Sequence, residues 1–241
     1  MNKAIIIGAS SGIGEALVDF LVNDGYVVGI TARREELLVA IQKRFPDRVF
    51  YKVMDVQQTD KIEQICEELS QTIGGLDLMI ISAGIGHLNK SLDFEISHDV
   101  VKTNVGGFTC IANWSMNYFQ KQGHGHLANI SSIAGLLGNG IAPSYNATKA
   151  YQINYFNGLR KKVKKLKLRI ALTDIRPGFV DTAILKGNGL FWIAPVDKAA
   201  KQIYAAIRRK KKRVYITKRW ALIALIIRLK PSLFWFLKTA E

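Results

Sequence analysis

KAIIIGASSGIG (residues 3–14) joins a short apolar run to a turn that contains Gly8, Gly12 and Gly14. The apolar run has the length of a buried strand, and an amphipathic helical pattern over residues 12–23 follows the turn. Glycine permits a tight turn and a close approach of backbone to a pyrophosphate, while a helix N-terminus supplies N–H donors and the positive end of a dipole. The stretch therefore predicts a strand–turn–helix unit that binds nucleotide phosphates, although a purely structural glycine turn would have the same pattern.

The rest of the chain repeats this alternation of short apolar runs and helix-length amphipathic segments. The further strands are expected at residues 26–31, 49–54, 76–82, 125–131, 168–175 and 213–217. The further helices are expected at residues 34–45, 60–73, a longer region reaching 119, a segment around 145, and 197–210. Alternating strands and helices imply right-handed crossovers, so the sequence predicts one Rossmann-type doubly wound α/β domain with a seven-stranded parallel sheet flanked by helices.

The composition of the 241 residues, 49% hydrophobic and 22% charged, argues against disorder. The first residues lack the apolar core and cleavage site of a signal peptide, and no stretch has the roughly 18–20 unbroken apolar residues of a membrane span. The expectation is a cytoplasmic protein, with peripheral membrane association as an open alternative.

The cysteines and histidines show no metal-ligand spacing, so no metal site is expected. Cys66 and Cys110 lie in apolar periodic segments, which favours buried free thiols in a reducing compartment. His124 and His126 are expected at loop or helix-end positions.

The formal net charge of +15 is concentrated late in the chain, in the basic runs 160–169 and 208–213. Such runs are most often solvated faces, but they also suit an anionic membrane or nucleic acid. Because no recognition motif or aromatic stacking surface accompanies them, we expect no specific nucleic-acid partner.

The glycine spacing GxxxGxG, followed by Tyr145 and Lys149 four residues apart, resembles the classical short-chain dehydrogenase/reductase family. The resemblance covers about residues 3–216, and the motifs occur in the family's order. Ser82 is a departure, because the family usually has asparagine there. The resemblance implies cofactor contacts at Gly8, Ser10, Ser11, Gly12, Ile13, Gly14, Asp55, Val56, Ala83, Gly84, Asn104, Tyr145, Lys149, Pro177, Gly178, Val180 and Thr182.

A tyrosine is a poor acid–base catalyst near neutrality because its unperturbed pKa is about 10. Lys149 lies one helical turn from Tyr145, where an ammonium would lower that pKa. The resemblance implies that Tyr145 protonates a carbonyl oxygen as hydride arrives from the nicotinamide, and that Ser132, rather than Ser131, hydrogen-bonds the same oxygen. It also implies that Lys149 holds the nicotinamide ribose and that Asn104 anchors a water in the proton relay. Taken alone, a tyrosine and a lysine at this spacing are more often solvent-exposed residues without a catalytic role. The ordered set of motifs favours catalysis by Tyr145 and Lys149.

The end of the second predicted strand bears on cofactor choice. NAD-binding folds place a carboxylate there, whereas this chain has Ala32, Arg33 and Arg34. A guanidinium suits a bidentate contact to a 2′-phosphate, so Arg33 predicts NADP(H) in preference to NAD(H). A solvated arginine at a helix start is the alternative.

The loop AILKGNGLFWIAPVD (residues 183–197) is apolar and contains glycines that could let it open and close. Its apolar side chains are Leu185, Leu190, Phe191, Trp192 and Ile193, and its glycines are Gly187 and Gly189. This composition favours a small hydrophobic carbonyl or alcohol substrate. The alternative is that the aromatic residues pack on the body of the protein or on a partner subunit.

Residues 1–217 are expected to form the catalytic domain, and residues 218–241 a hydrophobic and basic C-terminal extension that Pro231 divides into two short helices. Three interpretations of the extension remain open. It would contact an anionic membrane surface, pack across a homodimer or homotetramer interface, or fold over its own substrate cleft.

Two functions compete on this sequence. The first is an NADPH-dependent carbonyl reductase, or the reverse alcohol dehydrogenase, acting through Asn104, Ser132, Tyr145 and Lys149. The second is a non-catalytic cofactor-sensing or membrane-associated scaffold with the same fold. The complete set of four residues favours the enzyme.

Overall fold

Seven parallel strands form the central sheet of the computed structural model, which describes residues 1–184 and 191–229. The strands are β1 (Lys3–Ile7), β2 (Val27–Ala32), β3 (Val49–Val53), β4 (Leu78–Ile81), β5 (His124–Ile130), β6 (Arg169–Pro177) and β7 (Arg213–Ile216). They lie in the order β3-β2-β1-β4-β5-β6-β7, which confirms the predicted doubly wound sheet.

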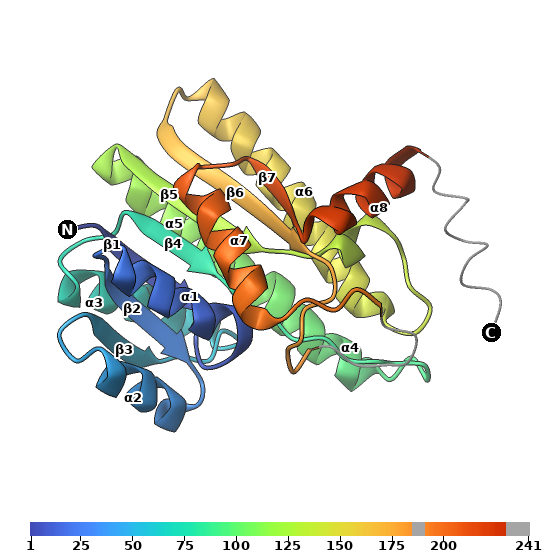
Figure 1. Cartoon of the computed structure of the whole chain (residues 1–241), viewed down its shortest axis with the longest axis horizontal. Coiled ribbons are helices and arrows are strands. Elements are labelled where there is room, and N and C mark those ends of the chain that lie inside the picture. Colours follow the sequence, from blue (N-terminus) through green and yellow to red (C-terminus); the bar gives the residue numbers. More distant parts are fainter. Residues whose placement is uncertain (185–190, 230–241) are drawn as a thin grey trace.

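Helices cover both faces of this sheet (Figure 1). They are α1 (Gly12–Asn23), α2 (Glu35–Arg44), α3 (Thr59–Thr72), α4 (Phe94–Val101), η1 (Lys102–Gly107), α5 (Phe108–Gln122), η2 (Ile133–Leu136), α6 (Pro143–Lys165), α7 (Val196–Arg208) and α8 (Lys218–Leu229). One apolar core lies under α1, α2 and α7, and the other under α3, α5 and α6. Alternate residues of β1 enter the two cores, Ile6 the first and Ile5 and Ile7 the second, which explains why the strand is an unbroken apolar run.

The position of the site follows from the strand order. β1 pairs with β2 on one side and with β4 on the other, so the order of connections reverses at β1. In open α/β sheets ligands bind at such a reversal, beyond the carboxyl ends of the strands. Gly8 follows β1 and Ala83 follows β4 at this point.

The helical region predicted to reach residue 119 is interrupted by a π-helix. α4, η1 and α5 run without a break from Phe94 to Gln122, and η1 carries Asn104. A π-helical turn is rare inside an α-helix and is frequent at functional sites. The amphipathic pattern of the sequence contains no signal for it.

The C-terminal extension is described as far as Leu229, and α8 has one buried and one exposed face. Trp220, Ala224 and Ile227 are buried. The exposed face carries the apolar side chains of Leu222, Leu225 and Leu229, which are 59%, 52% and 72% exposed. The predicted bend at Pro231 and the second helix lie outside the described residues. Among those residues, no helix combines the length and the hydropathy needed to cross a membrane.

Three residues differ from their expected surroundings. Cys66 is a buried free thiol as expected, but Cys110 is only partly buried. His124 and His126 lie in β5 and not in a loop. His126 is buried, and its Nε2 is 2.8 Å from the Thr173 hydroxyl on β6. That hydrogen bond allows the imidazole to occupy a strand position inside the protein.

Candidate active site

The glycine turn between β1 and α1 leaves no room for larger residues. Gly8 and Gly12 have φ angles of +86° and +61°, which other residues rarely adopt. A side chain at Gly14 would collide with the carbonyl of Gly8, and one at Gly8 would collide with the backbone of Ala83. At Gly12 the nearest atom outside the turn is the Thr182 methyl, 3.2 Å from where a Cβ would lie. The glycine turn and the segment after β6 therefore face each other. The prediction requires this arrangement, because it assigns Gly12 to the cofactor phosphates and Thr182 to the nicotinamide end of the same cofactor.

Two arginines at the start of α2 have different surroundings. The Arg34 guanidinium donates hydrogen bonds to the hydroxyls of Ser10 and Ser11, at 3.0 and 3.1 Å. Arg33, which the sequence predicted as a cofactor contact, lines a neighbouring pocket. Arg34 is therefore the residue at the phosphate turn that sequence reasoning missed. The sequence contained a signal for Arg34, namely that it directly follows Arg33. Side chains of consecutive residues in an extended segment point in opposite directions, so the two arginines are expected to face different surroundings.

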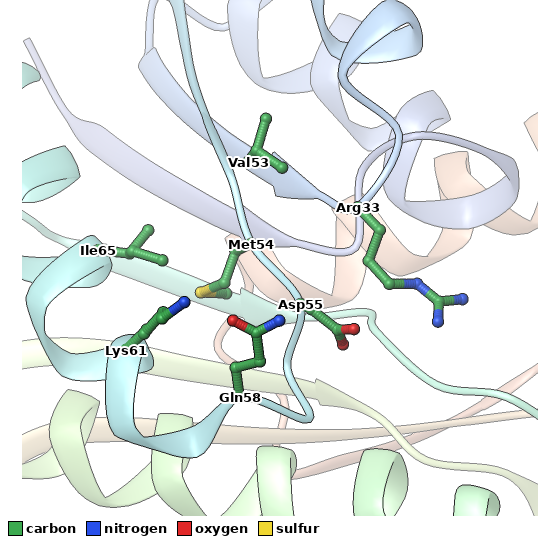
Figure 2. Close-up of a pocket in the computed structure, with 7 residues that line it drawn as sticks. All are labelled: Arg33, Val53, Met54, Asp55, Gln58, Lys61 and Ile65. Carbon is green, nitrogen blue, oxygen red and sulfur yellow. The ribbon is translucent and has the colours of Figure 1, made fainter.

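The pocket beside Arg33 has a volume of about 380 Å³. It is lined by Arg33, Val53, Met54, Asp55, Gln58, Lys61 and Ile65. Figure 2 shows Arg33 coming from the end of β2 and Lys61 from α3, with Asp55 between them in this view. Apolar walls with a cation on either side suit a flat base and an adjoining phosphate. Val56, the other half of the predicted adenine pair, has its side chain in the core.

A second pocket, of about 450 Å³, lies along α4. It is lined by His87, Leu88, Glu95, Ile96 and Asp99. The described lining of neither pocket includes Tyr145 or Ser132, so both pockets lie outside the predicted reaction centre.

Backbone hydrogen bonds join β4 to β1 where Ser82 replaces the usual asparagine. The amides of Ser82 and Ala83 both donate to the carbonyl of Ile7, at 2.9 and 2.8 Å. Gly84 then passes close to two predicted site residues. A Cβ there would lie 3.2 Å from the Asn104 Oδ1 and 3.3 Å from the Lys149 Nζ.

Asn104 holds the loop after β4 in place through side-chain hydrogen bonds. Its side-chain oxygen accepts from the Ile85 amide at 2.9 Å, and its side-chain nitrogen donates to the Ile85 carbonyl at 2.8 Å and to the Thr148 hydroxyl at 3.1 Å. Its main-chain oxygen accepts from the Gln152 side chain at 2.9 Å. The role of Asn104 as a water anchor stays a prediction.

The two candidate serines after β5 differ in their partners. The Ser131 hydroxyl is buried, 2.5 Å from an Asp174 oxygen and 2.9 Å from the Ile175 carbonyl. Ser132 accepts from the Ala134 amide at 3.1 Å, donates to the Pro177 carbonyl at 3.4 Å, and lies close enough to Tyr145 for its hydroxyl to lower the pKa of the phenol. The geometry therefore pairs Tyr145 with Ser132 and turns Ser131 toward the sheet.

Burial raises the pKa of Tyr145, and the hydrogen bond from Ser132 only partly opposes this. The sequence predicted a lowered pKa caused by Lys149. In the structure the Lys149 Nζ is 5.9 Å from the centre of the Tyr145 ring and donates elsewhere, so desolvation of the phenolate dominates. Gly86 packs on the same ring; a Cβ there would lie 2.9 Å from it. The phenol is thus protonated at neutral pH.

Lys149 is buried on α6 and donates to the Ile130 carbonyl at 3.1 Å and to the Gln152 side-chain oxygen at 3.2 Å. Burial lowers its pKa to about 8, and the Asp174 carboxylate opposes that shift. An ammonium has three N–H donors. Two have acceptors within the described part of the chain, which leaves a third for a ribose hydroxyl at Gly84. The donor set therefore fits the predicted cofactor.

The segment that follows β6 is fixed by backbone hydrogen bonds and by α8. The Gly178 amide donates to the Ile216 carbonyl at 2.6 Å, and the Ala194 amide donates to the Phe179 carbonyl at 3.0 Å. Gly178 lies against the Trp220 ring, where any side chain would collide. Of the predicted contacts here, Pro177 ends β6, and Val180 is buried and bridges Ala194.

An aromatic cluster continues from this segment. Its members are Phe179, Phe191, Trp192 and Trp220, with neighbouring ring centres 5.1–6.1 Å apart. Leu185, Gly187, Gly189 and Leu190 of the predicted substrate loop lie outside the described residues. The remaining aromatic residues of the loop pack on the body of the protein, which was one of the two interpretations of their sequence.

A sequence model described as short chain dehydrogenase matches residues 2–189. The chain belongs to the short chain dehydrogenase family. Proteins of this family bind NAD(P)(H) and act as oxidoreductases.

Relatives in two staphylococcal species agree with this assignment. A protein of Staphylococcus aureus (strain USA300) is 33% identical over 213 residues, which cover 86% of this chain and 91% of the relative. One of Staphylococcus saprophyticus is 31% identical over 214 residues, which cover 84% and 89%. Both are named as uncharacterised oxidoreductases.

Solved structures share the fold. A short-chain dehydrogenase from Streptomyces avermitilis superposes with a TM-score of 0.83 at 24% identity, covering 96% of this chain and 94% of the other. A variant of actinorhodin polyketide ketoreductase, crystallised with NADPH, gives a TM-score of 0.69 at 26% identity, covering 76% and 72%.

Proposed function

We propose that this short chain dehydrogenase uses NADPH to reduce a small hydrophobic ketone or aldehyde. The observation that supports this most is the environment of Tyr145, whose phenol is kept protonated by burial and lies beside the Ser132 hydroxyl. A protonated phenol is the form that donates a proton to a carbonyl oxygen. The NADPH-bound ketoreductase among the structural relatives also supports reduction with NADPH as the direction of the reaction.

Bound NADPH would supply hydride to the carbonyl carbon. Tyr145 gives its proton to the carbonyl oxygen, so that hydride and proton together complete the alcohol. Ser132 donates a hydrogen bond to the same oxygen and stabilises the charge that develops there. Lys149 would hold the cofactor ribose through its remaining N–H, and its positive charge would stabilise the phenolate left on Tyr145.

The preference for NADPH rests on cations around the pocket that would hold the ribose and its 2′-phosphate. Arg33 and Lys61 line that pocket, and Arg34 lies against the serines of the phosphate turn. Asp55 is the carboxylate of the pocket, but it follows β3 and not β2, where NAD-binding folds place theirs.

The preference for an apolar substrate rests on the side chains around the segment after β6. Phe191, Trp192 and Ile193 are each nearly half exposed, and Ile184 lies beside Gly86 and hence beside Tyr145. Ile184 is thus an exposed apolar side chain next to the predicted reaction centre, and such a group favours a hydrophobic ligand.

The test is a panel of hydrophobic ketones, aldehydes and β-keto thioesters, followed by the loss of NADPH absorbance. We expect turnover with at least one class, and Tyr145→Phe should lower kcat by about 100-fold or more while NADPH still binds. Fluorescence titration of NADPH checks the second point. Full activity in Tyr145→Phe, or no consumption of either cofactor with any carbonyl, would contradict the proposal.

A further inference from the structure

Gln152 is a fully buried amide that joins two residues of the predicted site. It lies three residues after Lys149 on α6. Its side-chain nitrogen donates to the main-chain oxygen of Asn104 at 2.9 Å, and its side-chain oxygen accepts from the Lys149 Nζ at 3.2 Å. The Asn129 side chain on β5 approaches the same oxygen at 3.4 Å.

An amide of this length satisfies both of these neighbours. A carbonyl oxygen needs a donor and an ammonium needs an acceptor, and a glutamine side chain carries one of each. An apolar side chain would fill the space with Ile153 and Phe156 nearby on the helix, but it would remove a hydrogen-bond partner from each of two buried polar groups. The position is therefore chemically specified, and packing alone does not explain it.

We propose that Gln152 is a positioning residue for Lys149, fixing the ammonium between α6 and the π-helix η1 so that its remaining N–H points toward the cofactor. The inference rests on the proposed function, because it assigns Lys149 a part in the reaction. Gln152 also links Asn104 to Lys149 directly, through the main-chain oxygen of Asn104. The family resemblance predicts a link through a water molecule at the same residue.

Few charged or titratable groups surround Lys149. Tyr145 lies on the same helix, and Asp174 on β6 is the one carboxylate whose charge affects Lys149 among the described residues. Asp174 is itself paired with Arg176, at 2.7 Å. The sides facing β5 and η1 contribute neutral groups, Asn129 and Asn104. A change at Gln152 should therefore be visible in the titration of Lys149.

The experiment measures that titration directly, by ¹³C NMR of the lysine side-chain carbons in the full chain without cofactor or substrate. Lys149→Arg identifies the Lys149 signal. Gln152→Met removes the acceptor and should shift the titration midpoint down by about one pH unit, the size of a lost hydrogen bond to a charged group. Gln152→Glu keeps an oxygen acceptor and adds negative charge, so its midpoint should move up.

Two controls separate positioning from general disruption. Tyr151→Phe changes an exposed side chain on the same helix and should leave the Lys149 midpoint unchanged. NADPH affinity, measured by fluorescence, should fall several-fold in Gln152→Met and stay within about twofold in Tyr151→Phe.

Midpoints that do not move, or that move in the same direction in both variants, would overturn the proposal. If Gln152→Met does not fold, Gln152→Glu decides alone, and an unchanged midpoint rejects the role. A wild-type protein that reduces no carbonyl would contradict the proposed function, while the titration would still test the contact.

Discussion

Burial raises the pKa of Tyr145 and lowers that of Lys149, so desolvation moves both side chains toward their neutral forms. The two shifts have different consequences. Tyr145 keeps the proton it needs for donation, whereas Lys149, with a pKa of about 8, stays largely charged at neutral pH because the Asp174 carboxylate opposes the effect of burial. The residues around this pair therefore set its chemistry as much as the pair itself does.

Cofactor selectivity is the property of single residues that is simplest to test. Arg33→Ala should raise the KM for NADPH about tenfold or more, with little effect on NADH, because it removes one charge-assisted contact to the 2′-phosphate. Arg34→Ala should weaken both cofactors alike, since it releases Ser10 and Ser11. Steady-state kinetics with both cofactors provides the measurement.

Lys43→Ala, at the far end of α2, is the matched control and should change neither KM. A wild-type preference for NADH, or equal effects of Arg33→Ala on the two cofactors, would contradict the role predicted for Arg33.

Single residues were predictable where a family motif fixes both spacing and order. The motifs predicted Ser132, Tyr145 and Lys149 as neighbours, and the structure places Ser132 at the start of η2, beside Tyr145, with Lys149 one turn further along α6. Gln152 carried no such signal, because one polar residue on a buried helix face shows its use only when its partners on η1 are known. The lowered pKa predicted for Tyr145 failed for a related reason, since sequence spacing reports proximity and not burial.

At the scale of elements, β5 contains a titratable group inside the sheet. Burial lowers the pKa of His126 to about 4, with a smaller effect from Lys210. An unfolded histidine titrates near 6.5, so between about pH 6.5 and 4 the unfolded chain binds more protons than the folded one. Stability should therefore fall as the pH falls through this window, by at most about 3 kcal/mol.

Urea unfolding at pH 7 and pH 5 measures this difference. His126→Gln, which retains a hydrogen bond to Thr173 but does not titrate, should show a smaller loss of stability at pH 5. His124→Gln removes the exposed histidine of the same strand and should behave as the wild type. Equal pH dependence in all three proteins would contradict the assignment.

The packing of α8 on the segment after β6 is a second property of elements. Trp220→Ala removes a buried ring and should destabilise the protein by about 3–5 kcal/mol. It should also weaken NADPH binding, because Gly178 loses the surface against which it lies. Thermal unfolding and fluorescence titration are the measurements. Leu222→Ala, on the exposed face of the same helix, should change neither, and unaltered NADPH affinity in Trp220→Ala would show that α8 does not support the site.

Elements with a strong hydrophobic period were predicted within a few residues of their ends, as α1 and α3 show. What could not be predicted is the contact of α8 with Gly178. Its sequence is apolar on nearly all sides, so the choice of buried face depends on which surface the preceding strand leaves beside it.

For the whole molecule, the net charge of +15 is unevenly distributed. The guanidinium of Arg160 donates to the Lys212 carbonyl, which brings the two basic runs together at the amino ends of β6 and β7. The cofactor site lies beyond the opposite, carboxyl ends of the strands. An anionic surface could therefore contact the basic face without covering the reaction centre.

Contact of the extension with an anionic membrane, one of the three interpretations of its sequence, is testable with vesicles of phosphatidylserine and phosphatidylcholine. Ending the chain at Thr217 is a poor variant, because it also removes the buried Trp220. Changing Leu222 and Leu225 to serine should instead reduce co-sedimentation several-fold, and Ile141→Ser, at another exposed apolar residue, should not. Equal binding by all proteins would exclude the leucine face of α8 as the contact.

The π-helix η1 has one further consequence for comparing this chain with its relatives. A π-helical turn is wider than an α-helical one and behaves as a single-residue insertion in a longer helix. Deleting Gly106, beside which there is open space, would restore the regular winding and rotate the preceding residues by about 100°. Asn104 would then turn away from Ile85. The site thus depends on the number of residues in this helix as well as on their identity, so a relative without the π-helical turn would align with this chain only through a gap.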